Sequence, residues 1–380
     1  MPSPVSRRGF LKAGLAAAAG AGLAAGQAAL PQALHASAGG QLCTVLDLSR
    51  CIGCEACVDA CRDQWQASVP DPVSPIPQPF PPRVPIEDWS QKKDVRDRLT
   101  PYNFLYVEHL DLERQGKSVE LHIPRRCMHC VNPPCTNLCP FGAGKVERSG
   151  VVHIDPDICL GGAKCKQVCP WQVPQRQSGM GLYLHILPEY AGNGVMFKCH
   201  RCLPLVEKGQ APRCIEACPN QAQTIGPRAA QVAQATELAR RMAQADGRAE
   251  AWREYVYGLD ENGGTNTLYV SPVPFPVVNA ALNKLHLEQA EADGPSRPGQ
   301  GRGQAAKDGR GQGRRLAQAG RPHMGPVANS MQSEENLAKA LVIAPVAGLI
   351  AGLGGLLGGA RKLGRALDKA QSKIQKGGQS

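Results

Sequence analysis

The feature that most constrains the fold of this chain is a run of closely spaced cysteines, Cys51, Cys54, Cys57 and Cys61. Two gaps of two residues followed by a gap of three are typical of thiolates that bind a 4Fe-4S cluster, with the fourth reaching a second cluster. Structural zinc sites use two separated pairs of cysteines, so a third cysteine at this spacing is one ligand too many. The run therefore predicts iron-sulfur clusters, and zinc is the alternative.

Three further cysteine runs follow, and one of them is incomplete. The third run has Gly162 between Cys159 and Cys165, where a second ligand is expected, and glycine has no side chain to bind iron. We expect a 3Fe-4S cluster there. The alternatives are a 4Fe-4S cluster whose fourth iron binds water or a residue such as Asp157 or Lys164, and an empty site. The candidate ligands are Cys51, Cys54, Cys57, Cys61, Cys127, Cys130, Cys135, Cys139, Cys159, Cys165, Cys169, Cys199, Cys202, Cys214 and Cys218.

Three residues near these runs are not expected to be ligands. Cys43 lies outside every spacing pattern and is expected to be a small strand residue. His129 and His200 lie inside two-residue gaps of cysteine sets that are already complete, so we expect loop residues. The sequence contains no pairing of a nucleophile with a base and no flavin or pterin motif, so no catalytic residue is assigned.

The composition agrees with a protein built around clusters. Sixteen cysteines stand against only 4% aromatic residues, which indicates that metal binding supplies much of the folding free energy. The net charge of +11 would suit a nucleic-acid partner. The excess basic residues, however, gather in residues 7–12, 295–325 and 361–380, and the cysteine-bearing body is slightly acidic. No nucleic-acid partner is therefore expected.

Residues 1–38 have the features of a twin-arginine export signal. Residues 6–12, Ser-Arg-Arg-Gly-Phe-Leu-Lys, precede an apolar run, and residues 36–38, Ala-Ser-Ala, form a small-residue cleavage site. This export route carries proteins that are already folded around their cofactors. Cysteines can therefore keep their clusters in a compartment that otherwise favours disulfides. We expect the mature chain on the periplasmic face of the inner membrane.

The body, residues 39–290, is expected to have an α+β fold. Its inserted segment 62–126 contains no cysteine and is expected to form an extended loop over 69–85 and then a hairpin. The hairpin strands are expected over 103–109 and 118–123, on either side of Gly116. Further expected elements are strands over 43–50, 150–155 and 267–270, a turn over 261–265, and a helix over 229–257 with a break near 246–247.

The C-terminal part changes in character. Residues 291–339, rich in Gly, Gln and Arg, are expected to form a flexible linker. Residues 340–360 carry no charge and are just long enough to cross a bilayer as a helix, although a helix docked at the interface is the alternative. The basic tail 361–380 follows directly, and the positive-inside rule assigns it to the cytoplasm.

The four cysteine runs, the export signal and the single C-terminal anchor together resemble the iron-sulfur subunits of membrane-bound periplasmic oxidoreductases, in layout those of nickel-iron hydrogenases and formate dehydrogenases. The resemblance covers residues 45–274, including Gly-Leu-Asp-Glu-Asn-Gly-Gly-Thr-Asn-Thr-Leu-Tyr at 258–269. It implies tandem, nested bacterial-ferredoxin-like modules with a C-terminal transmembrane helix, in which the first run pairs with the fourth and the second with the third. The implied sets are Cys51, Cys54, Cys57 and Cys218; Cys61, Cys199, Cys202 and Cys214; Cys127, Cys130, Cys135 and Cys169; and Cys139, Cys159 and Cys165.

The same resemblance implies a non-catalytic electron-transfer subunit. Single electrons would pass through three 4Fe-4S clusters and one 3Fe-4S or incompletely ligated 4Fe-4S cluster. Their route would join a periplasmic catalytic subunit, of hydrogenase or formate dehydrogenase type, to a membrane quinone-reactive or cytochrome b subunit. Two alternatives stay open. One is the beta subunit of a molybdenum reductase for sulfur compounds or similar acceptors, and the other is a membrane-tethered metal-binding scaffold without a redox role.

Overall fold

A computed structural model describes residues 40–82, 84–292 and 320–331. Its largest sheet has four strands in the order β8–β1–β10–β9, namely β8 (Gln223–Pro227), β1 (Leu42–Asp47), β10 (Thr267–Val270) and β9 (Val256–Tyr257). The inner strand β1 runs antiparallel to β8 and parallel to β10. Its residues are almost all buried, as expected of an apolar strand with neighbours on both sides. The strand expected over 267–270 is confirmed, and that expected over 43–50 is confirmed as far as Asp47.

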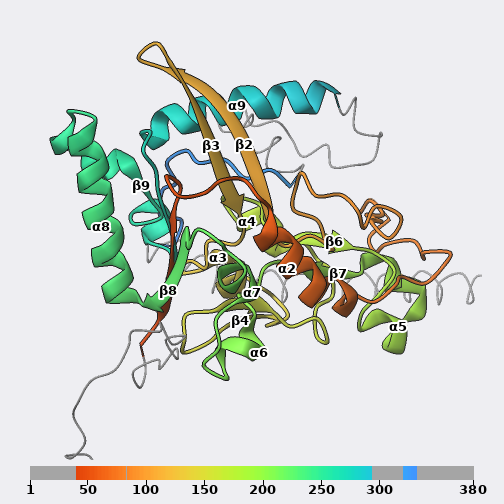
Figure 1. The fold of residues 1–380 in the computed structure, drawn as a ribbon. Coiled ribbons are helices and arrows are strands. Elements are labelled where there is room, and N and C mark those ends of the chain that lie inside the picture. The colour runs from red at the N-terminus through yellow and green to blue at the C-terminus, as the bar shows by residue number, and fades with distance from the viewer. Residues whose placement is uncertain (1–39, 83, 293–319, 332–380) are drawn as a thin grey trace, which may run out of the picture. The chain divides into compact units, whose positions relative to one another are not determined.

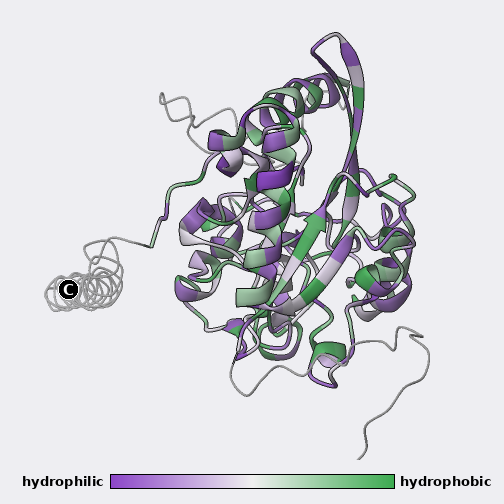
Figure 2. Cartoon of the chain, turned by 60° about the vertical axis from the view of Figure 1, so that its left-hand side comes forward, coloured by the Kyte–Doolittle hydropathy of each residue, from purple (hydrophilic) through white to green (hydrophobic). Residues whose placement is uncertain are grey.

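Helix α8 (Arg228–Ala245) covers one face of this sheet. Ala235, Ala239 and Ala243 repeat every four residues, are fully buried, and pack with Cys43 and Leu268 of the strands. Such small side chains let the helix backbone approach the sheet closely. Figure 2 shows hydrophilic and hydrophobic residues mixed along α8, as expected of a helix with one exposed face. The expected break is confirmed, because the helix ends at Ala245 and a 3-10 helix, η3 (Ala249–Tyr255), follows.

The cysteine-bearing part consists of short elements. Four helices each carry, as their second residue, the cysteine at the third ligand position of a run, and all gather near the middle of the view in Figure 1. They are α2 (Ala56–Trp65), α3 (Pro134–Asn137), α4 (Lys164–Val168) and α7 (Arg213–Glu216). The other elements here are the ribbons β4 (Gly144–Val146) with β5 (Val152–Ile154) and β6 (Gln175–Gln177) with β7 (Val195–Phe197), and the short helices η1 (Gln66–Ser68), α5 (Tyr183–Ile186), η2 (Pro188–Asn193) and α6 (Leu203–Val206).

The predicted hairpin is confirmed with longer strands. Strand β2 (Tyr106–Arg114) pairs antiparallel with β3 (Lys117–Arg125), and Gly116 at the turn has a φ of 73°. Positive φ is easy for glycine, which explains its place between the strands. A long helix that the sequence did not predict, α9 (Phe275–Ala292), lies beside the hairpin (Figure 1). The turn expected over 261–265 contains a 3-10 helix, η4 (Glu261–Gly263), and Gly264 caps its C-terminal end.

A buried polar network fastens α9 to the hairpin. The Nε2 atom of His286 lies 3.0 Å from Oε2 of Glu108, and the hydroxyl of Tyr106 donates to the same oxygen at 2.7 Å. Burial acts to raise the pKa of Glu108, but the hydrogen bond and charge of His286 outweigh it and lower the pKa. The folded state therefore favours the Glu108 carboxylate. This contribution to stability is present above the pKa of the unfolded chain and is lost as pH falls through the lower folded value.

Replacement of His286 by alanine is expected to loosen α9. The variant would leave the buried Glu108 carboxylate without its hydrogen bond to His286, which typically costs about 1–3 kcal/mol. Amide hydrogen exchange over residues 275–292 should become faster by a large factor. Lys284→Ala is the matched control, because its pairing with Glu288 on the same helix is exposed and 4.0 Å long. Equal protection of α9 in both variants would contradict the network's role.

Residues 320–331 correct the linker assignment of 291–339. The carbonyl of Gly320 accepts from the backbone N–H of Leu99 at 2.9 Å, and that of Val327 accepts from Asn262 at 2.9 Å. Met324 is 1% exposed and belongs to the main apolar core. We call residues 320–331 the strap. Its polar composition suggested a linker, but two features fix it to the body: backbone hydrogen bonds, which any residue can make, and one buried apolar side chain.

Tyr257→Phe is expected to release the strap. The Tyr257 hydroxyl donates to the carbonyl of Gly325 at 2.8 Å and accepts from Nε1 of Trp171 at 2.8 Å. Without it both buried groups lose a partner, at about 1–3 kcal/mol each. Limited proteolysis should then cut residues 320–331 at least about tenfold faster, since 1.4 kcal/mol is a factor of ten. Tyr102→Phe, whose hydroxyl contacts the loop at Pro70, should leave the rate unchanged; an equal effect of both would argue against this anchor.

The export signal 1–38, the transmembrane segment 340–360, the basic tail 361–380 and the rest of the linker lie outside the described residues. Within the described residues, none of the helices has both the length and the apolar character needed to span a bilayer. The mixed helix and strand composition agrees with the α+β expectation. The predicted C-terminal membrane helix stays a prediction.

Candidate iron-sulfur centres

Fifteen of the sixteen cysteines gather into four groups, and none of the sixteen forms a disulfide. The groups combine the first cysteine run with the fourth, and the second with the third. Cys43 stays apart in β1, fully buried, as expected. The groups are site I (Cys51, Cys54, Cys57, Cys218), site II (Cys61, Cys199, Cys202, Cys214), site III (Cys127, Cys130, Cys135, Cys169) and site IV (Cys139, Cys159, Cys165).

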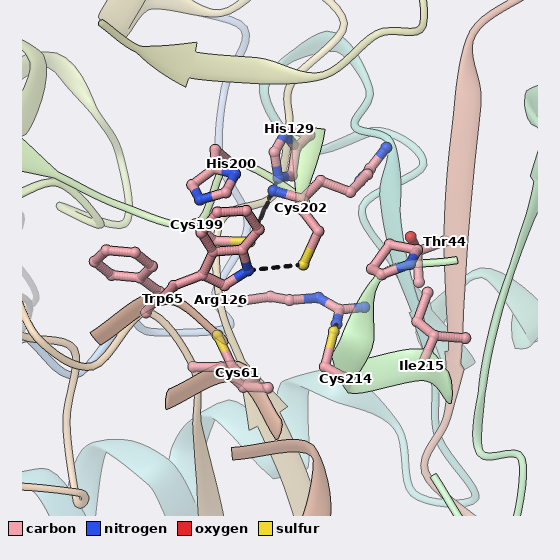
Figure 3. Close-up of a pocket in the computed structure, with 14 residues that line it drawn as sticks. Thr44, Cys61, Trp65, Arg126, His129, Cys199, His200, Cys202, Cys214 and Ile215 are labelled. Atoms are coloured by element: carbon pink, nitrogen blue, oxygen red, sulfur yellow. Dashed lines mark hydrogen bonds between the residues drawn. The ribbon is translucent and has the colours of Figure 1, made fainter. Parts of the chain in front are cut away.

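The four cysteines of site II line one hollow of about 410 Å³. Figure 3 shows their sulfurs around a common opening, with Cys61 arriving from α2 and Cys214 from α7. Burial raises the pKa of the Cys61 thiol well above its usual value, and neighbouring Cys214, Cys199 and Cys202 raise it further. Cys61 is thus a neighbour of the fourth run's cysteines.

Site III has the same construction. Its four cysteines line a second hollow, of about 350 Å³, together with Trp171 and Lys198. Burial raises the pKa of the Cys169 thiol to about 12, and the nearby Cys135 and Cys127 add to the shift. Cys169 belongs to the third run by sequence, so the second run is completed across the fold by a cysteine of the next one.

At the two outer sites, I and IV, each cysteine group is likewise shown by thiols that raise the pKa of a neighbouring thiol. At site I, burial raises the pKa of Cys51 most, and the neighbouring Cys218 and Cys54 contribute further. At site IV, burial raises the pKa of Cys165, and its neighbours include Cys159 and Cys139.

Gly162, which replaces the expected fourth cysteine of site IV, has room for a side chain. A Cβ atom built on it would meet only Cε2 of Phe141, at 3.4 Å.

The four sites form a row. Burial raises the pKa of Cys57 of site I, and Cys214 of site II raises it further; burial likewise raises the pKa of Cys199 of site II, and Cys127 of site III adds to that shift. Cys165 of site IV has Cys135 and Cys169 of site III among its neighbours. Because such charge effects act over short distances, consecutive sites adjoin in the order I, II, III, IV.

The local structure around the sulfurs explains why these spacings recur. The cysteine at the third ligand position of each run lies in the first turn of a helix, where free N–H groups favour negative charge. The residue before two of these helices adopts a left-handed conformation, Glu55 with φ 56° and Ala163 with φ 54°. N–H groups of His129, Met196, Arg201 and Ala222 lie 3.3–3.5 Å from Cys127, Cys159, Cys199 and Cys218, respectively.

This donor set fits iron-sulfur clusters. Several thiols surround each hollow, and backbone N–H groups donate to the sulfurs, as is usual for cluster sites. In the part of the chain that the structure describes, no three His, Cys, Asp or Glu side chains converge on one point where a single metal ion would bind. When bound, the clusters accept and release single electrons. The chain's residues hold the thiols in place, exclude water and stabilise negative charge.

Two buried cations contact ligand sulfurs and were not among the residues that the sequence analysis singled out. Nη1 of Arg126 donates to Sγ of Cys214 at 3.0 Å and to Oε1 of Gln223 at 2.8 Å. Nζ of Lys198 lies 3.6 Å from Sγ of Cys127 and donates to the carbonyls of Cys199 and Val152. The available signal was a basic residue directly before the first cysteine of a run, which occurs at Arg50, Arg126 and Lys198 but not in the incomplete third run.

The electrostatics of both cations depend on the sulfurs. Burial acts to lower the pKa of Arg126, but the charge of Cys214 and Cys199 outweighs it and the pKa is raised. Burial likewise acts to lower the pKa of Lys198, but the charges of Cys127, Cys135 and Cys199 outweigh it and the pKa is raised. Both side chains therefore stay positively charged although neither is more than 6% exposed.

Four aromatic side chains, Trp65, Phe104, His129 and His200, complete the walls of site II. Trp65 donates its Nε1 proton to Sγ of Cys202 at 3.0 Å and stacks edge-on against His200, with ring centroids 4.3 Å apart. Nδ1 of His129 accepts from the backbone of Val152 at 3.0 Å, so Nε2 carries the proton and points to Cys199, at 3.8 Å from its sulfur. Burial lowers the pKa of both histidines, that of His200 to about 4. Both histidines line the hollow beside complete cysteine sets.

Comparison with known proteins agrees with these sites. Two models of 4Fe-4S dicluster domains match residues 50–143 and 119–228. The chain is 30% identical over 320 residues to the hydrogenase-2 operon protein HybA of Escherichia coli O157:H7, a match that covers 74% of this chain and 84% of that protein. This protein belongs to the family of iron-sulfur electron-transfer subunits of oxidoreductases. Its resemblance to such subunits is thereby confirmed.

Other relatives in this family come from different enzyme systems. The chain is 30% identical over 197 residues to a sulfite dehydrogenase subunit of Allochromatium vinosum, covering 49% of this chain and 68% of that protein. It is 28% identical over 182 residues to a subunit of the anaerobic dimethyl sulfoxide reductase of Escherichia coli K12, a match that covers 48% of this chain and 71% of that protein. The chain therefore transfers electrons through 4Fe-4S clusters as a non-catalytic subunit. These similarities are also compatible with its being the subunit of an enzyme that acts on sulfur compounds.

Proposed function

We propose that this iron-sulfur subunit carries single electrons along the row I–II–III–IV through three 4Fe-4S clusters and one 3Fe-4S cluster. The observation that carries the proposal is the grouping of fifteen cysteines into three sets of four and one set of three. A 4Fe-4S cluster takes four thiolates, so each complete set serves one cluster. Site IV offers three thiolates beside Gly162, which favours a cluster with one iron fewer.

The proposed partners are a periplasmic catalytic subunit of hydrogenase or formate dehydrogenase type and a membrane quinone-reactive or cytochrome b subunit. Similarity to a protein of a hydrogenase operon supports the hydrogenase type. The twin-arginine signal in residues 1–38 and the apolar stretch 340–360 support export and anchoring at the periplasmic face of the inner membrane. The second candidate partner is a molybdenum enzyme for sulfur compounds, which the similarity to the sulfite dehydrogenase subunit favours.

Iron and sulfide analysis of the purified chain, combined with EPR, tests this proposal. We expect about fifteen iron atoms per chain and an EPR signal in the oxidised state, which a 3Fe-4S cluster gives and 4Fe-4S clusters of this type do not. Bound zinc, or fewer than about eight iron atoms, would refute the four-cluster assignment. The catalytic subunit that co-purifies from the native host separates the hydrogenase and sulfur-compound candidates. Membrane fractionation before and after removal of residues 340–380 tests the anchor.

A further inference from the structure

Sites II and III each contain a buried cation whose counter-charge is sulfur. Arg126 is 6% exposed and Lys198 is 5% exposed. Their polar contacts in the described residues are thiols, backbone carbonyls and the neutral amide of Gln223, and none is a carboxylate. A buried charge without an opposite charge nearby is costly enough that folded proteins avoid it. The negative charge of a thiolate-bound cluster is therefore the partner that these two side chains require.

The outer sites are built differently. At site I, the N–H of Ala222 donates to Cys218, and at site IV that of Met196 donates to Cys159, so neutral backbone amides supply the hydrogen bonds. Burial raises the pKa of the Cys159 thiol, and the nearby carboxylate of Asp155 adds to the shift, so the charged side chain that acts on this sulfur is an anion. Arg126 also acts on Cys57 of site I, but its hydrogen bond goes to Cys214 of site II. Among the described residues, the direct contacts of Arg126 and Lys198 with ligand sulfurs therefore lie at the two middle members of the row.

A buried positive charge affects the oxidation states of a cluster unequally. Reduction adds one negative charge, and a cation within hydrogen-bonding distance of a ligand sulfur stabilises the reduced form more than the oxidised form. In a dry interior this difference is only weakly screened, so charge and hydrogen bonding to the sulfurs are among the main determinants of cluster potential.

We propose that Arg126 and Lys198 raise the reduction potentials of the clusters at sites II and III, so that the middle of the row holds an electron more strongly than site I does. This inference rests on the proposed function, because it requires clusters at these sites. Arg126 acts on site II through Cys214 and Lys198 on site III through Cys127. Electrons that enter through site I would therefore move downhill into the protein and accumulate there before they leave.

Redox titration followed by EPR on the full chain tests the inference with four variants. In Arg126→Met and Lys198→Met, the ratio of reduced to oxidised cluster at a fixed potential should fall at least tenfold for one cluster, equivalent to a 59 mV lower midpoint for one electron. Arg126→Lys keeps the charge and should change the ratio far less. Arg213→Met is the matched control, because Arg213 also directly precedes a cysteine but is exposed and paired with Glu216 at 2.6 Å; no change is expected.

Iron and sulfide content, measured on the same samples, distinguish a failure of the proposed function from a failure of the inference about reduction potentials. A wild-type chain without clusters would refute the proposed function itself. Full iron content with unshifted midpoints in both methionine variants would overturn the inference and leave the function standing. If Arg126→Met loses a cluster that Arg126→Lys retains, the need for a counter-charge is supported. Loss of the cluster from Arg126→Lys as well would overturn it, because shape rather than charge would then decide.

Discussion

Gly162→Cys is expected to convert the three-iron cluster proposed for site IV into a 4Fe-4S cluster. The new thiol would stand where the other three runs have their second cysteine, Cys54, Cys130 and Cys202. The position accepts a side chain, since an added Cβ meets only the edge of Phe141 at 3.4 Å, an ordinary contact distance. Iron content should rise by about one atom per chain, and the EPR signal of the oxidised state should disappear.

The control for this change is Gly162→Ala, which adds the same Cβ atom without sulfur. It should leave both the iron content and the oxidised-state signal unchanged, because no ligand is gained. A Gly162→Cys variant with the wild-type signal would show that the fourth corner of site IV is not next to residue 162, or that another group already occupies it. In either case the assignment of a three-iron cluster on the basis of the missing cysteine would fall.

Cys61→Ser is expected to remove the cluster of site II and spare that of site I. Cys61 lies in the same run as three ligands proposed for site I, but its neighbours in the fold are Cys199, Cys202 and Cys214. Its thiol is buried in the wall of the hollow at site II. A serine hydroxyl is a much poorer iron ligand than a thiolate. The variant should lose up to about four iron atoms per chain.

The assignment is tested by comparing EPR spectra of the reduced variants. Cys61→Ser should lose the same signal as Cys202→Ser, although these two positions are far apart in sequence. It should differ from Cys54→Ser, although Cys54 lies in the same run. Cys43→Ser serves as the control, because Cys43 is buried in β1 outside all four sites and should keep every cluster. A spectrum of Cys61→Ser that matches Cys54→Ser would mean that the runs are self-contained and not exchanged.

Parts of the fold with strong local signals were predicted correctly. The hairpin follows from alternating residues on either side of Gly116, and the strand over 267–270 follows from its β-branched and aromatic residues. Helix α9 was missed because its apolar positions, Phe275, Val278 and Leu282, follow a Pro-rich stretch and give only a modest helical pattern. The strap was missed because most of its hydrogen bonds join its own backbone atoms to backbone and side-chain groups of the body, which composition does not reveal.

The sequence by itself determined which residues form the candidate sites and what chemistry they suit. Cysteine spacing depends on the short reach of one chain segment around one cluster, so it can be read locally. The missing ligand at Gly162 could be read in the same way.

Only the tertiary structure decided which of the basic residues that precede a run are buried against the sulfurs of the candidate sites. Arg50 is exposed, whereas Arg126 and Lys198 are buried against sulfurs far away in sequence or in a neighbouring site. Burial and long-range contacts determine how strongly a charged side chain interacts with its neighbours, because they remove the water that would screen the charge. No local sequence pattern encodes burial or long-range contacts.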